Sequence, residues 1–504
     1  MREYVAAIDQ GTTGTRCYLF DRNGSPVSSA YREHRQIFPR PGWVEHDPVE
    51  IRDRVAEVVA EAVRAAPPGS ILAVGVTNQR ETVVVWDAES GQPAANAIVW
   101  QDTRTAADCE AAIRNGWEED VRARTGLPIS TYFSATKIGW LMENVPRARE
   151  LSRSGRLRIG TIDSWVIWNL TGGPLGGAHV TDPTNASRTL LCNLASLEWD
   201  PLLLERFRVP QESLPAIRPS IAPEPYGHTS PDGPFGDRIP VCGDLGDQQA
   251  ALFGQGCFEA GEAKNTYGTG SFLLGHVGSR PAPSVSGLLA TAAAAGPGKR
   301  AYALEGSVAI TGAAVQWLRD SLGLIGTAAE SEAIARSVPD CGGVYFVPAF
   351  SGLYAPYWDM RARGTIVGLT RFVTRAHLVR ATLESICFQS REVADAMEAD
   401  SGRKFETLKV DGGATENDFL MQLQADVLGI PVVRPVVRET TALGAAYAAG
   451  LAARVFDSTD ALRRLWKADR TFEPEWDVSR RESAYRNWKR AVERARGWIE
   501  EPRV

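Results

Sequence analysis

The chain has 504 residues, of which 44% are hydrophobic and 23% are charged, and its formal net charge is −6. This length and composition predict a globular protein of at least two domains, and the acidic balance argues against a nucleic-acid partner. The sequence contains no run of about 18 apolar residues, so no membrane span is predicted. Its seven cysteines are scattered and form no C-x-x-C pair, which predicts a reduced, cytoplasmic chain without disulfides or a zinc site.

The first predicted elements are two strands, residues 4–8 and 16–20, around the loop in IDQGTTGTR. Glycine lets the backbone approach a ligand closely, and successive N–H groups in such a turn form an anion-binding nest. Threonine hydroxyls add donors. Asp9 would repel a phosphate but can hold Mg²⁺, which bridges carboxylate and phosphate oxygens. The loop therefore predicts a nucleotide-phosphate site, although one Gly/Thr hairpin alone is also an ordinary turn.

Helices and strands alternate through the first half. Asp47, Pro48 and Glu50 predict a helix start, followed by apolar residues at helical spacing up to the Pro-Pro-Gly at 67–69. Residues 71–76 and 83–86 predict buried strands, and residues 160–172 predict a helix with an aromatic face. The proline-rich stretches 201–240 and 279–285 predict surface loops.

The second half repeats the opening theme. KNTYGTGSFLL at 264–274 places a second Gly/Thr turn between two apolar stretches. Residues 404–410 predict a strand that runs into Gly412 and Gly413, and residues 418–428 predict a helix ended by Gly429. Two such halves predict a ligand cleft between them. No Walker A pattern and no G-x-G-x-x-G after a strand is present, so neither a P-loop nor a Rossmann site is predicted.

The order of IDQGTTGTR, NTYGTG and VDGGA resembles the sugar-kinase/actin/heat-shock ATPase superfamily and, within it, the FGGY carbohydrate kinases that act on glycerol. Further stretches match in family order along nearly the whole chain: GWVEHDP, TNQRET, NAIVWQD, TDPTNASRT, GDQQAALFGQ, YALEGSV, GLYAPYWD, GLTR, RATLES and TALGAAY. The resemblance implies an α/β fold of two ribonuclease H-like domains, residues 1–253 and 254–504, with an interdomain cleft.

The resemblance also implies two groups of site residues. The glycerol group comprises Arg80, Glu81, Trp100, Tyr132, Asp247 and Gln248, with Asp247 as the general base. The nucleotide group comprises Thr12, Thr13, Gly14, Arg16, Thr269, Gly312, Gln316, Gly413 and Asn417. Asp9 and Asp247 would place Mg²⁺. The second domain would hold the second phosphate loop and the adenosine.

The activity implied is ATP-dependent phosphorylation of glycerol to sn-glycerol 3-phosphate, the first step of glycerol catabolism. Arg80 can donate, Glu81 can accept and Gln248 can do both, so three hydroxyls can be fixed in space. An aromatic platform covers the carbon side, and a carboxylate takes the hydroxyl proton. The implied partners are glycerol and ATP, with no nucleic acid and no membrane span, and the expected assembly is a homodimer or homotetramer.

Structural alternatives stand beside these roles. Asp9 and Asp247 could cap turns, and Arg80 with Glu81 could form an ordinary surface ion pair, although a cleft rim is favoured. Trp100 could be plain core. Without the resemblance, Gln316 and Asn417 are best explained as helix caps.

Two departures from the family pattern concern the cleft. Gly14 stands where many relatives have serine, so we expect one phosphate contact to be missing. Tyr354 replaces a small residue, and we expect it to crowd the cleft edge. In the segment 226–240, His228 is expected to be a solvated loop histidine.

Three other functions remain possible at this level. The first is an FGGY kinase for a pentulose or another polyol. The second is an ATP-driven conformational switch without a small-molecule acceptor. The third is a non-catalytic sensor, which is disfavoured because the proposed base, Asp247, is present.

Overall fold

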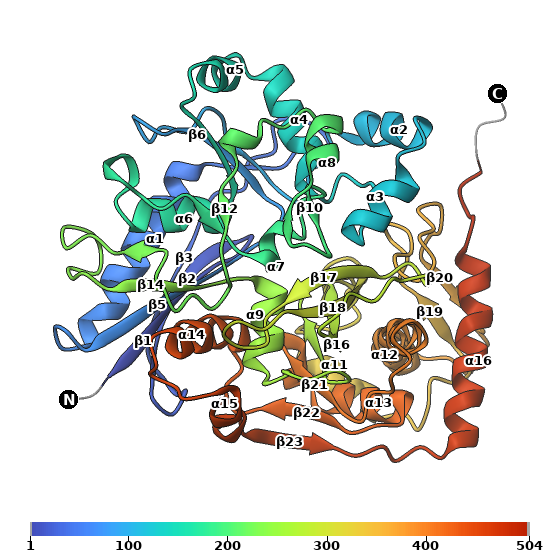
Figure 1. Cartoon of the computed structure of the whole chain (residues 1–504). Coiled ribbons are helices and arrows are strands. Elements are labelled where there is room, and N and C mark those ends of the chain that lie inside the picture. Colours follow the sequence, from blue (N-terminus) through green and yellow to red (C-terminus); the bar gives the residue numbers. More distant parts are fainter. Residues whose placement is uncertain (1–2, 501–504) are drawn as a thin grey trace.

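The apolar stretch at the N-terminus becomes the centre of a six-stranded sheet in the computed structural model, which describes residues 3–500. The strand order is β13-β14-β5-β1-β2-β3. Strand β1 (Tyr4–Gln10) pairs antiparallel with β2 (Gly14–Asp21) and parallel with β5 (Ile71–Asn78). All seven residues of β1 are buried, since helices cover the sheet: α1 and α6 lie above it in Figure 1 and α14 lies below.

The predicted helix start at Asp47 is confirmed. Helix α1 (Pro48–Ala62) has Asp47 as its N-cap, whose side chain accepts from the N–H of Val49 at 2.9 Å. A carboxylate at this position satisfies one of the free N–H groups of the first turn. The helix buries its apolar stripe on β2 and β3 and continues to residue 65 as a 3₁₀ turn.

The other elements of the first half complete this sheet and build a second layer above it (Figure 1). The strands are β3 (Pro26–Glu33), β4 (Glu45–His46), β6 (Val83–Asp87), β7 (Ala97–Ile98), β8 (Leu157–Thr161), β9 (Val180–Thr181), β10 (Cys192–Asn193), β11 (Glu198–Trp199), β12 (Ala216–Ile217), β13 (Gly227–His228) and β14 (Pro240–Gly246). The helices are α2 (Ala106–Arg114), α3 (Glu118–Thr125), α4 (Ser134–Asn144), α5 (Pro146–Arg153), α6 (Ile162–Leu170), α7 (Pro183–Ala186), α8 (Pro201–Arg206) and α9 (Asp247–Gly254).

The second half repeats the arrangement of β1, β2 and β5. Strand β15 (Ala263–Tyr267) pairs antiparallel with β16 (Ser271–Gly278) and parallel with β21 (Leu408–Asp411). These strands form a seven-stranded sheet in the order β17-β18-β16-β15-β21-β22-β23. The hairpin predicted around the second Gly/Thr turn is confirmed, and two equivalent sheets give the chain its two-domain α/β fold.

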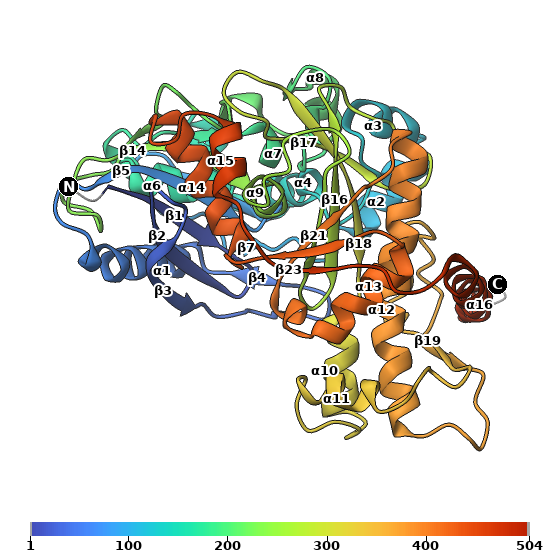
Figure 2. The same ribbon diagram turned by 90° about the horizontal axis from the view of Figure 1, so that it is seen from below.

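The long helix α12 packs on β16 and β18 of this second sheet, and the C-terminal α16 packs on α12 and α13 at the edge of the molecule (Figure 2). The remaining strands are β17 (Leu289–Ala293), β18 (Ala301–Val308), β19 (Tyr345–Val347), β20 (Thr365–Val367), β22 (Val432–Pro435) and β23 (Ala468–Phe472). The helices are α10 (Gly312–Asp320), α11 (Glu330–Arg336), α12 (Arg375–Ser401), α13 (Asp418–Leu428), α14 (Thr440–Ala452), α15 (Thr459–Leu465) and α16 (Val478–Ala495).

Helix α14 comes late in the chain but packs on the first sheet and on α9. The approach is so close that a Cβ on Gly444 would lie 1.9 Å from the carbonyl oxygen of Ala250, and a Cβ on Gly254 would lie 2.0 Å from that of Thr440. Only glycine permits this contact. The α9–α14 pair therefore joins the two halves directly behind Asp247.

Four sequence expectations need correction. Residues 157–161 form β8, so the helix expected over 160–172 begins only at Ile162. The strand expected over 404–410 begins at Leu408, where its partner β15 begins. The segment 201–240 is not only loop, because Asp200 caps α8 and two short strands follow. His228 therefore lies in the edge strand β13 rather than in a loop.

Within residues 3–500, no helix combines the length and apolar character needed to cross a bilayer. All seven cysteines carry free thiols and are buried.

Candidate active site

Four buried charges from both halves of the chain meet where the chain leaves β5 and beside the middle of β18. Arg80 is 3% exposed, and its two terminal nitrogens donate to both carboxylate oxygens of Glu305 at 2.5 and 3.0 Å. Glu81 accepts from Nε of Arg188 at 2.7 Å, and Arg188 also donates to Glu305 at 3.1 Å. Arg80 and Glu81 are thus neither a surface ion pair nor a cleft rim, but part of a buried cluster of two arginines and two glutamates.

The two glutamates in this cluster differ in their environment. Burial acts to raise the pKa of Glu305, but Arg188 and Arg80 outweigh it and lower the pKa to about 2. Burial raises the pKa of Glu81, against the lowering effect of Arg188 and Arg80. Glu305 is therefore the firmly ionised carboxylate that holds both arginines.

Asp247 is the exposed member of this neighbourhood. It is the first residue of α9, its side chain is 28% exposed, and its Oδ1 lies 3.0 Å from Nε of Arg80. The same oxygen accepts from the N–H of Gln248 at 2.7 Å. Nε of Arg80 is buried and not aligned for a hydrogen bond despite this short distance. Asp247 therefore presents its carboxylate to solvent from a fixed position at a helix N-terminus.

Gln248 is oriented by a buried lysine. Nζ of Lys264, on β15, donates to Oε1 of Gln248 at 2.6 Å and to Oγ1 of Thr266 at 2.7 Å. Burial lowers the pKa of Lys264 to about 8, although Asp411, Glu305 and Asp247 act to raise it. Because the amide oxygen of Gln248 is occupied, its NH₂ group is left as a donor for a ligand.

Trp100 and Tyr132 lie together, with ring centroids 5.4 Å apart in a T-shaped arrangement. Trp100 is half-buried, so it is not plain core. The backbone at Tyr132 is held by Lys137, whose Nζ donates to the carbonyl oxygens of Tyr132 at 3.1 Å and Phe133 at 3.3 Å. The aromatic pair is thus fixed beside the charge cluster, and Arg188 lies 5.5 Å from the Tyr132 ring centroid.

The first Gly/Thr loop lies beside Asp247. Asp9, at the end of β1, is 7% exposed, and burial raises its pKa to about 7, with Asp247 and Glu439 adding to the effect and Arg16 opposing it. Arg16 reaches Oδ2 of Asp9 at 3.9 Å and Oε2 of Glu439 at 3.7 Å. The carboxylates of Asp9 and Glu439 and the long, flexible side chain of Arg16 therefore lie at the loop. Thr13 is exposed, and the Thr12 hydroxyl accepts from the indole N–H of Trp100 at 2.9 Å.

The structure gives a steric reason for Gly14. A Cβ at this position would lie 2.6 Å from the carbonyl oxygen of Arg32 and 2.6 Å from a ring carbon of Tyr31. The Tyr31 ring and strand β3 thus occupy the space that a serine side chain would need.

The second loop is held together by α10. The N–H groups of Thr311 and Ala313 both donate to the carbonyl oxygen of Thr269 at 3.0 Å. A Cβ on Gly312 would lie 2.5 Å from the carbonyl oxygen of Gly268, so glycine is required there. Thr269 is exposed, and Gln316 lies exposed on α10, past the helix start, so it is not a cap.

Gly413 and Asn417 lie at the end of β21, next to the second loop. A Cβ on Gly412 would lie 2.3 Å from the carbonyl oxygen of Tyr267. A Cβ on Gly413 would have no neighbouring atom within 4 Å. Asn417 is the N-cap of α13 and accepts from the N–H of Leu420 at 2.9 Å. Its amide also donates to Ser331 at 3.2 Å, so both ends of this side chain are used within the protein.

The predicted nucleotide residues differ in their relation to the glycerol group: Thr12, in the first loop, accepts a hydrogen bond from Trp100. Among residues 3–500, no hydrogen bond or ion pair joins Thr269, Gly312 or Gln316 to the charge cluster around Arg80. Glu305, on β18 of the second sheet, belongs to that cluster, and Lys264, on β15, bonds Gln248 next to Asp247.

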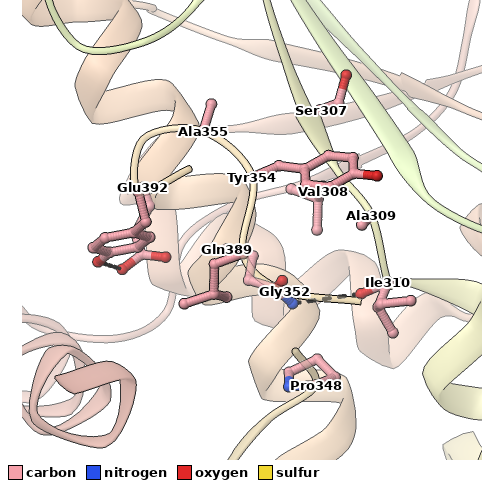
Figure 3. A pocket seen from close by; sticks show the side chains of 12 residues that line it. Ser307, Val308, Ala309, Ile310, Pro348, Gly352, Tyr354, Ala355, Gln389 and Glu392 are labelled. Atoms are coloured by element: carbon pink, nitrogen blue, oxygen red, sulfur yellow. Dashed lines mark hydrogen bonds between the residues drawn. The ribbon is translucent and has the colours of Figure 1, made fainter. Parts of the chain in front are cut away.

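Tyr354 lines a pocket at the end of β18 (Figure 3). The pocket lies between residues 307–310, the 348–357 loop and α12, and Gln389 reaches the carbonyl oxygen of Ile310 across it at 3.5 Å. The Tyr354 ring stacks on Trp358, with centroids 5.9 Å apart. Tyr354 thus lies beside the segment that leads into α10 and Gly312, and among residues 3–500 no hydrogen bond or ring contact joins it to the charge cluster.

Four residues that position the site were missed from the sequence: Lys137, Arg188, Lys264 and Glu305. All four are nearly or fully buried charges. Each of these residues lies in or next to one of the motif stretches of the sequence. A charged residue inside an apolar strand, such as Glu305 in YALEGSV, was the available signal for a buried charge.

Comparison with known proteins gives consistent results. Residues 4–254 match the N-terminal domain, and residues 263–453 the C-terminal domain, of the FGGY family of carbohydrate kinases. A glycerol kinase of Mycolicibacterium vanbaalenii is 57% identical over 99% of this chain and 100% of that protein. A glycerol kinase of Mycobacterium tuberculosis is 56% identical over 99% of this chain and 97% of that protein. The crystal structure of Plasmodium falciparum glycerol kinase with ADP superimposes with a TM-score of 0.93 at 38% identity, covering 99% of each chain.

Proposed function

The chain belongs to the FGGY family of carbohydrate kinases, and on this premise we propose that it transfers the terminal phosphoryl group of ATP to glycerol, giving sn-glycerol 3-phosphate. The family and the two-domain α/β fold predicted from the motifs are confirmed. The observation that carries the choice of substrate is 56–57% identity to glycerol kinases over nearly the whole chain.

The chemistry of the acceptor site supports this choice. A triol offers hydroxyls and a short carbon chain. Gln248 has a free NH₂ donor, Asp247 has an exposed carboxylate, and the Trp100–Tyr132 pair offers apolar surface beside them. In this proposal Arg80, Glu81 and Tyr132 also bind hydroxyls, from a cluster whose geometry is set before the ligand arrives.

Asp247 acts as the general base. One glycerol oxygen bonds to the γ-phosphorus as the bond to the β–γ bridging oxygen breaks, ADP leaves, and the hydroxyl proton passes to the Asp247 carboxylate. The partial exposure of Asp247, next to residues that are almost fully buried, supports this role because a base must reach the ligand. The Arg80 guanidinium at 3.0 Å holds the carboxylate in place.

Asp9 and Asp247 are the residues that would hold Mg²⁺. Their donor set fits this ion, because Mg²⁺ takes one or two carboxylates and completes its shell with water and phosphate oxygens. The raised pKa of Asp9, about 7, reflects burial beside a second carboxylate, an environment that a divalent cation would relieve. When bound, the ion neutralises charge on the phosphoryl oxygens.

The nucleotide is proposed to lie between the two loops. Thr12, Thr13, Gly14 and Arg16 would bind phosphate from the first half. Thr269, Gly312, Gln316, Gly413 and Asn417 would bind phosphate and adenosine from the second. The exposure of Thr13, Thr269, Gln316 and Gly413 supports this, since these groups are open to a ligand. A cytoplasmic homodimer or homotetramer completes the proposal, and sedimentation of the purified chain measures the assembly.

A coupled ADP-release assay tests the substrate. The purified chain is given ATP, Mg²⁺ and, in turn, glycerol, dihydroxyacetone, erythritol, xylulose and ribulose. Glycerol should give the highest kcat/KM. If glycerol releases no ADP above the water background while a pentulose does, the proposal is wrong.

Replacing Asp247 by asparagine tests the base. Asn keeps the size and can orient a hydroxyl, but it cannot accept the proton, and loss of a general base costs about 10² to 10⁴ in rate. We expect Asp247→Asn to bind glycerol in calorimetry yet turn over at least about a hundredfold more slowly. Asp53→Asn, at an exposed position of α1, is the matched control and should retain full turnover. Near wild-type kcat in Asp247→Asn would place the base elsewhere.

A further inference from the structure

A closed ring of hydrogen bonds joins the loop that carries Arg80 and Glu81 to the first phosphate loop. Nε2 of Gln79 donates to the carbonyl oxygen of Gly11 at 3.2 Å, and the Thr82 hydroxyl donates to Oε1 of Gln79 at 2.9 Å. The backbone N–H of Trp100 donates to the Thr82 hydroxyl at 3.2 Å. The indole N–H of Trp100 donates to the Thr12 hydroxyl at 2.9 Å and closes the ring.

The ring encloses a strained turn. Glu81, between Gln79 and Thr82, has φ of 62°, in the left-handed region that residues with a side chain rarely adopt. Such a conformation is unfavourable and persists only where neighbouring bonds determine it. Thr82 and Gln79 are 0% and 1% exposed, so these bonds are shielded from water.

The phosphate loop is also held along its length by bonds to its carbonyl oxygens. The carbonyl oxygen of Thr12 accepts from Nε2 of Gln36 at 2.8 Å, and that of Thr13 accepts from the N–H of His34 at 3.3 Å. With that of Gly11 bound to Gln79, three successive carbonyl oxygens have partners within the protein. These bonds fix the backbone of the loop on which an anion would bind.

The Trp100 bond has a specific consequence for Thr12. Its hydroxyl oxygen accepts from the indole N–H, so its own proton remains available to donate outward. The Trp100 side chain therefore contributes its ring to the aromatic pair with Tyr132 and its N–H to the phosphate loop.

We propose that Gln79, Thr82 and Trp100 are positioning residues that couple the polyol site to the first phosphate loop, so that binding of the polyol strengthens binding of the nucleotide. The inference rests on the proposed function, since it takes glycerol and ATP as the two ligands. A polyol that settles on Glu81 and Trp100 stabilises the ring, and the ring fixes the orientation of Gly11 and Thr12. Thermodynamic linkage then requires the nucleotide to strengthen polyol binding by the same factor.

Thr82→Val tests this coupling. Valine keeps the shape of threonine but can neither donate to Gln79 nor accept from Trp100, and Thr82 itself has no proposed contact with either ligand. The matched control is Thr125→Val in α3, because Thr125 is equally buried and its hydroxyl donates to the carbonyl oxygen of Val121 at 2.7 Å, remote from the ring.

Calorimetry measures the Kd of a non-hydrolysable ATP analogue with Mg²⁺, with and without saturating glycerol. In the wild type and in Thr125→Val we expect the ratio of the two Kd values to lie in the range of about 5–150 that is typical of coupled sites. In Thr82→Val the ratio should fall below about twofold. A wild-type ratio of one, or an unchanged ratio in Thr82→Val, would overturn the inference.

Trp100→Phe provides a second test should Thr82→Val fold poorly. Phenylalanine keeps an aromatic face for the polyol but loses the N–H that binds Thr12, so the Kd of the analogue should weaken more than that of glycerol. A loss confined to glycerol would contradict the relay through Thr12. The wild type is also assayed for glycerol-dependent ADP release: its absence would refute the proposed function, whereas normal release with uncoupled binding refutes only this inference.

Discussion

Replacing Glu305 by glutamine tests the buried charge cluster most directly. Glu305 is 0% exposed and bonds two arginines, and its pKa falls from an ordinary 4.5 to about 2. At 1.36 kcal/mol per pKa unit, this fall makes the ionised form more stable than the neutral form by roughly 3 kcal/mol. Glutamine is a neutral isostere, so Glu305→Gln should lower the free energy of unfolding by about 3 kcal/mol, within the range of about 3–5 kcal/mol for breaking a buried ion pair.

The same substitution should impair polyol binding more than nucleotide binding. Glutamine offers one acceptor where Arg80 now has two, so the guanidinium loses its fixed plane beside Asp247. Loss of one charged hydrogen bond, worth roughly 1.5–3 kcal/mol, predicts a rise in glycerol KM of about 10- to 100-fold, with ATP KM changed less than about threefold. The expected direction with pH follows from the lowered pKa: this contribution is present above pH 4.5 and is lost as the pH falls toward 2.

Urea unfolding and initial-rate kinetics on the same preparations make the measurement. Glu332→Gln is the matched control, because Glu332 bonds Arg336 at 2.9 Å on the surface, where such a pair contributes about 0–1 kcal/mol. The double variant Glu305→Gln/Arg188→Gln removes one charge of each sign and should recover part of the stability. If Glu305→Gln loses less than about 1 kcal/mol and keeps its glycerol KM, the reasoning from the buried cluster is refuted.

Three further predictions concern single residues. Asp244 is fully buried with both carboxyl oxygens unpartnered, and burial, then Asp163 and Asp182, raise its pKa well above the ordinary 3.8. The stability that Asp244 contributes is therefore present below pH 3.8 and is lost as the pH rises toward its raised pKa. Asp244→Asn should thus be more stable than the wild type in urea at pH 8, and an equal or lower urea midpoint of unfolding would contradict this. Gly14→Ser should lower the thermal midpoint through the contacts with Arg32 and Tyr31, at a cost of about 1–3 kcal/mol, and should not tighten ATP binding; a gain in ATP affinity would restore the missing-contact explanation. Arg80→Lys should raise glycerol KM at least about tenfold, since lysine cannot bind Glu305 through two nitrogens. An unchanged KM would show that this two-nitrogen contact with Glu305 is not needed.

Features set by neighbours in the sequence were predictable. The Asp47 cap, the two Gly/Thr hairpins and the α13 helix with Asn417 before it and Gly429 after it depend on a few adjacent residues, and each lies where it was expected. Asp200 and Pro201 carry the same signature as Asp47 and Pro48, so α8 was also within reach of sequence reasoning.

Features set by distant partners were not predictable in this way. Glu305 lies 225 residues from Arg80 and Arg188 lies 107 residues from Glu81, so nothing local indicates either pair. The start of β21 is likewise fixed by its partner, because Leu408 pairs with Ala263, the first residue of β15. Resemblance supplied Arg80 and Glu81 as ligand residues but not the buried charges that hold them.

The charge balance of the acceptor site bears on which acceptors it can take. Arg80, Arg188 and Lys264 face Glu81, Glu305 and Asp247, so three cations meet three carboxylates. A site built for a phosphorylated or carboxylated sugar needs an excess of positive charge to replace the hydration of its ligand. The arginines here are already occupied by carboxylates of the protein, and the most exposed charge, on Asp247, is negative. With Asp247 as the proposed base, an anionic acceptor would meet repulsion from its carboxylate, whereas an uncharged polyol would not. This charge balance supports the proposal of glycerol rather than a sugar acid as the acceptor.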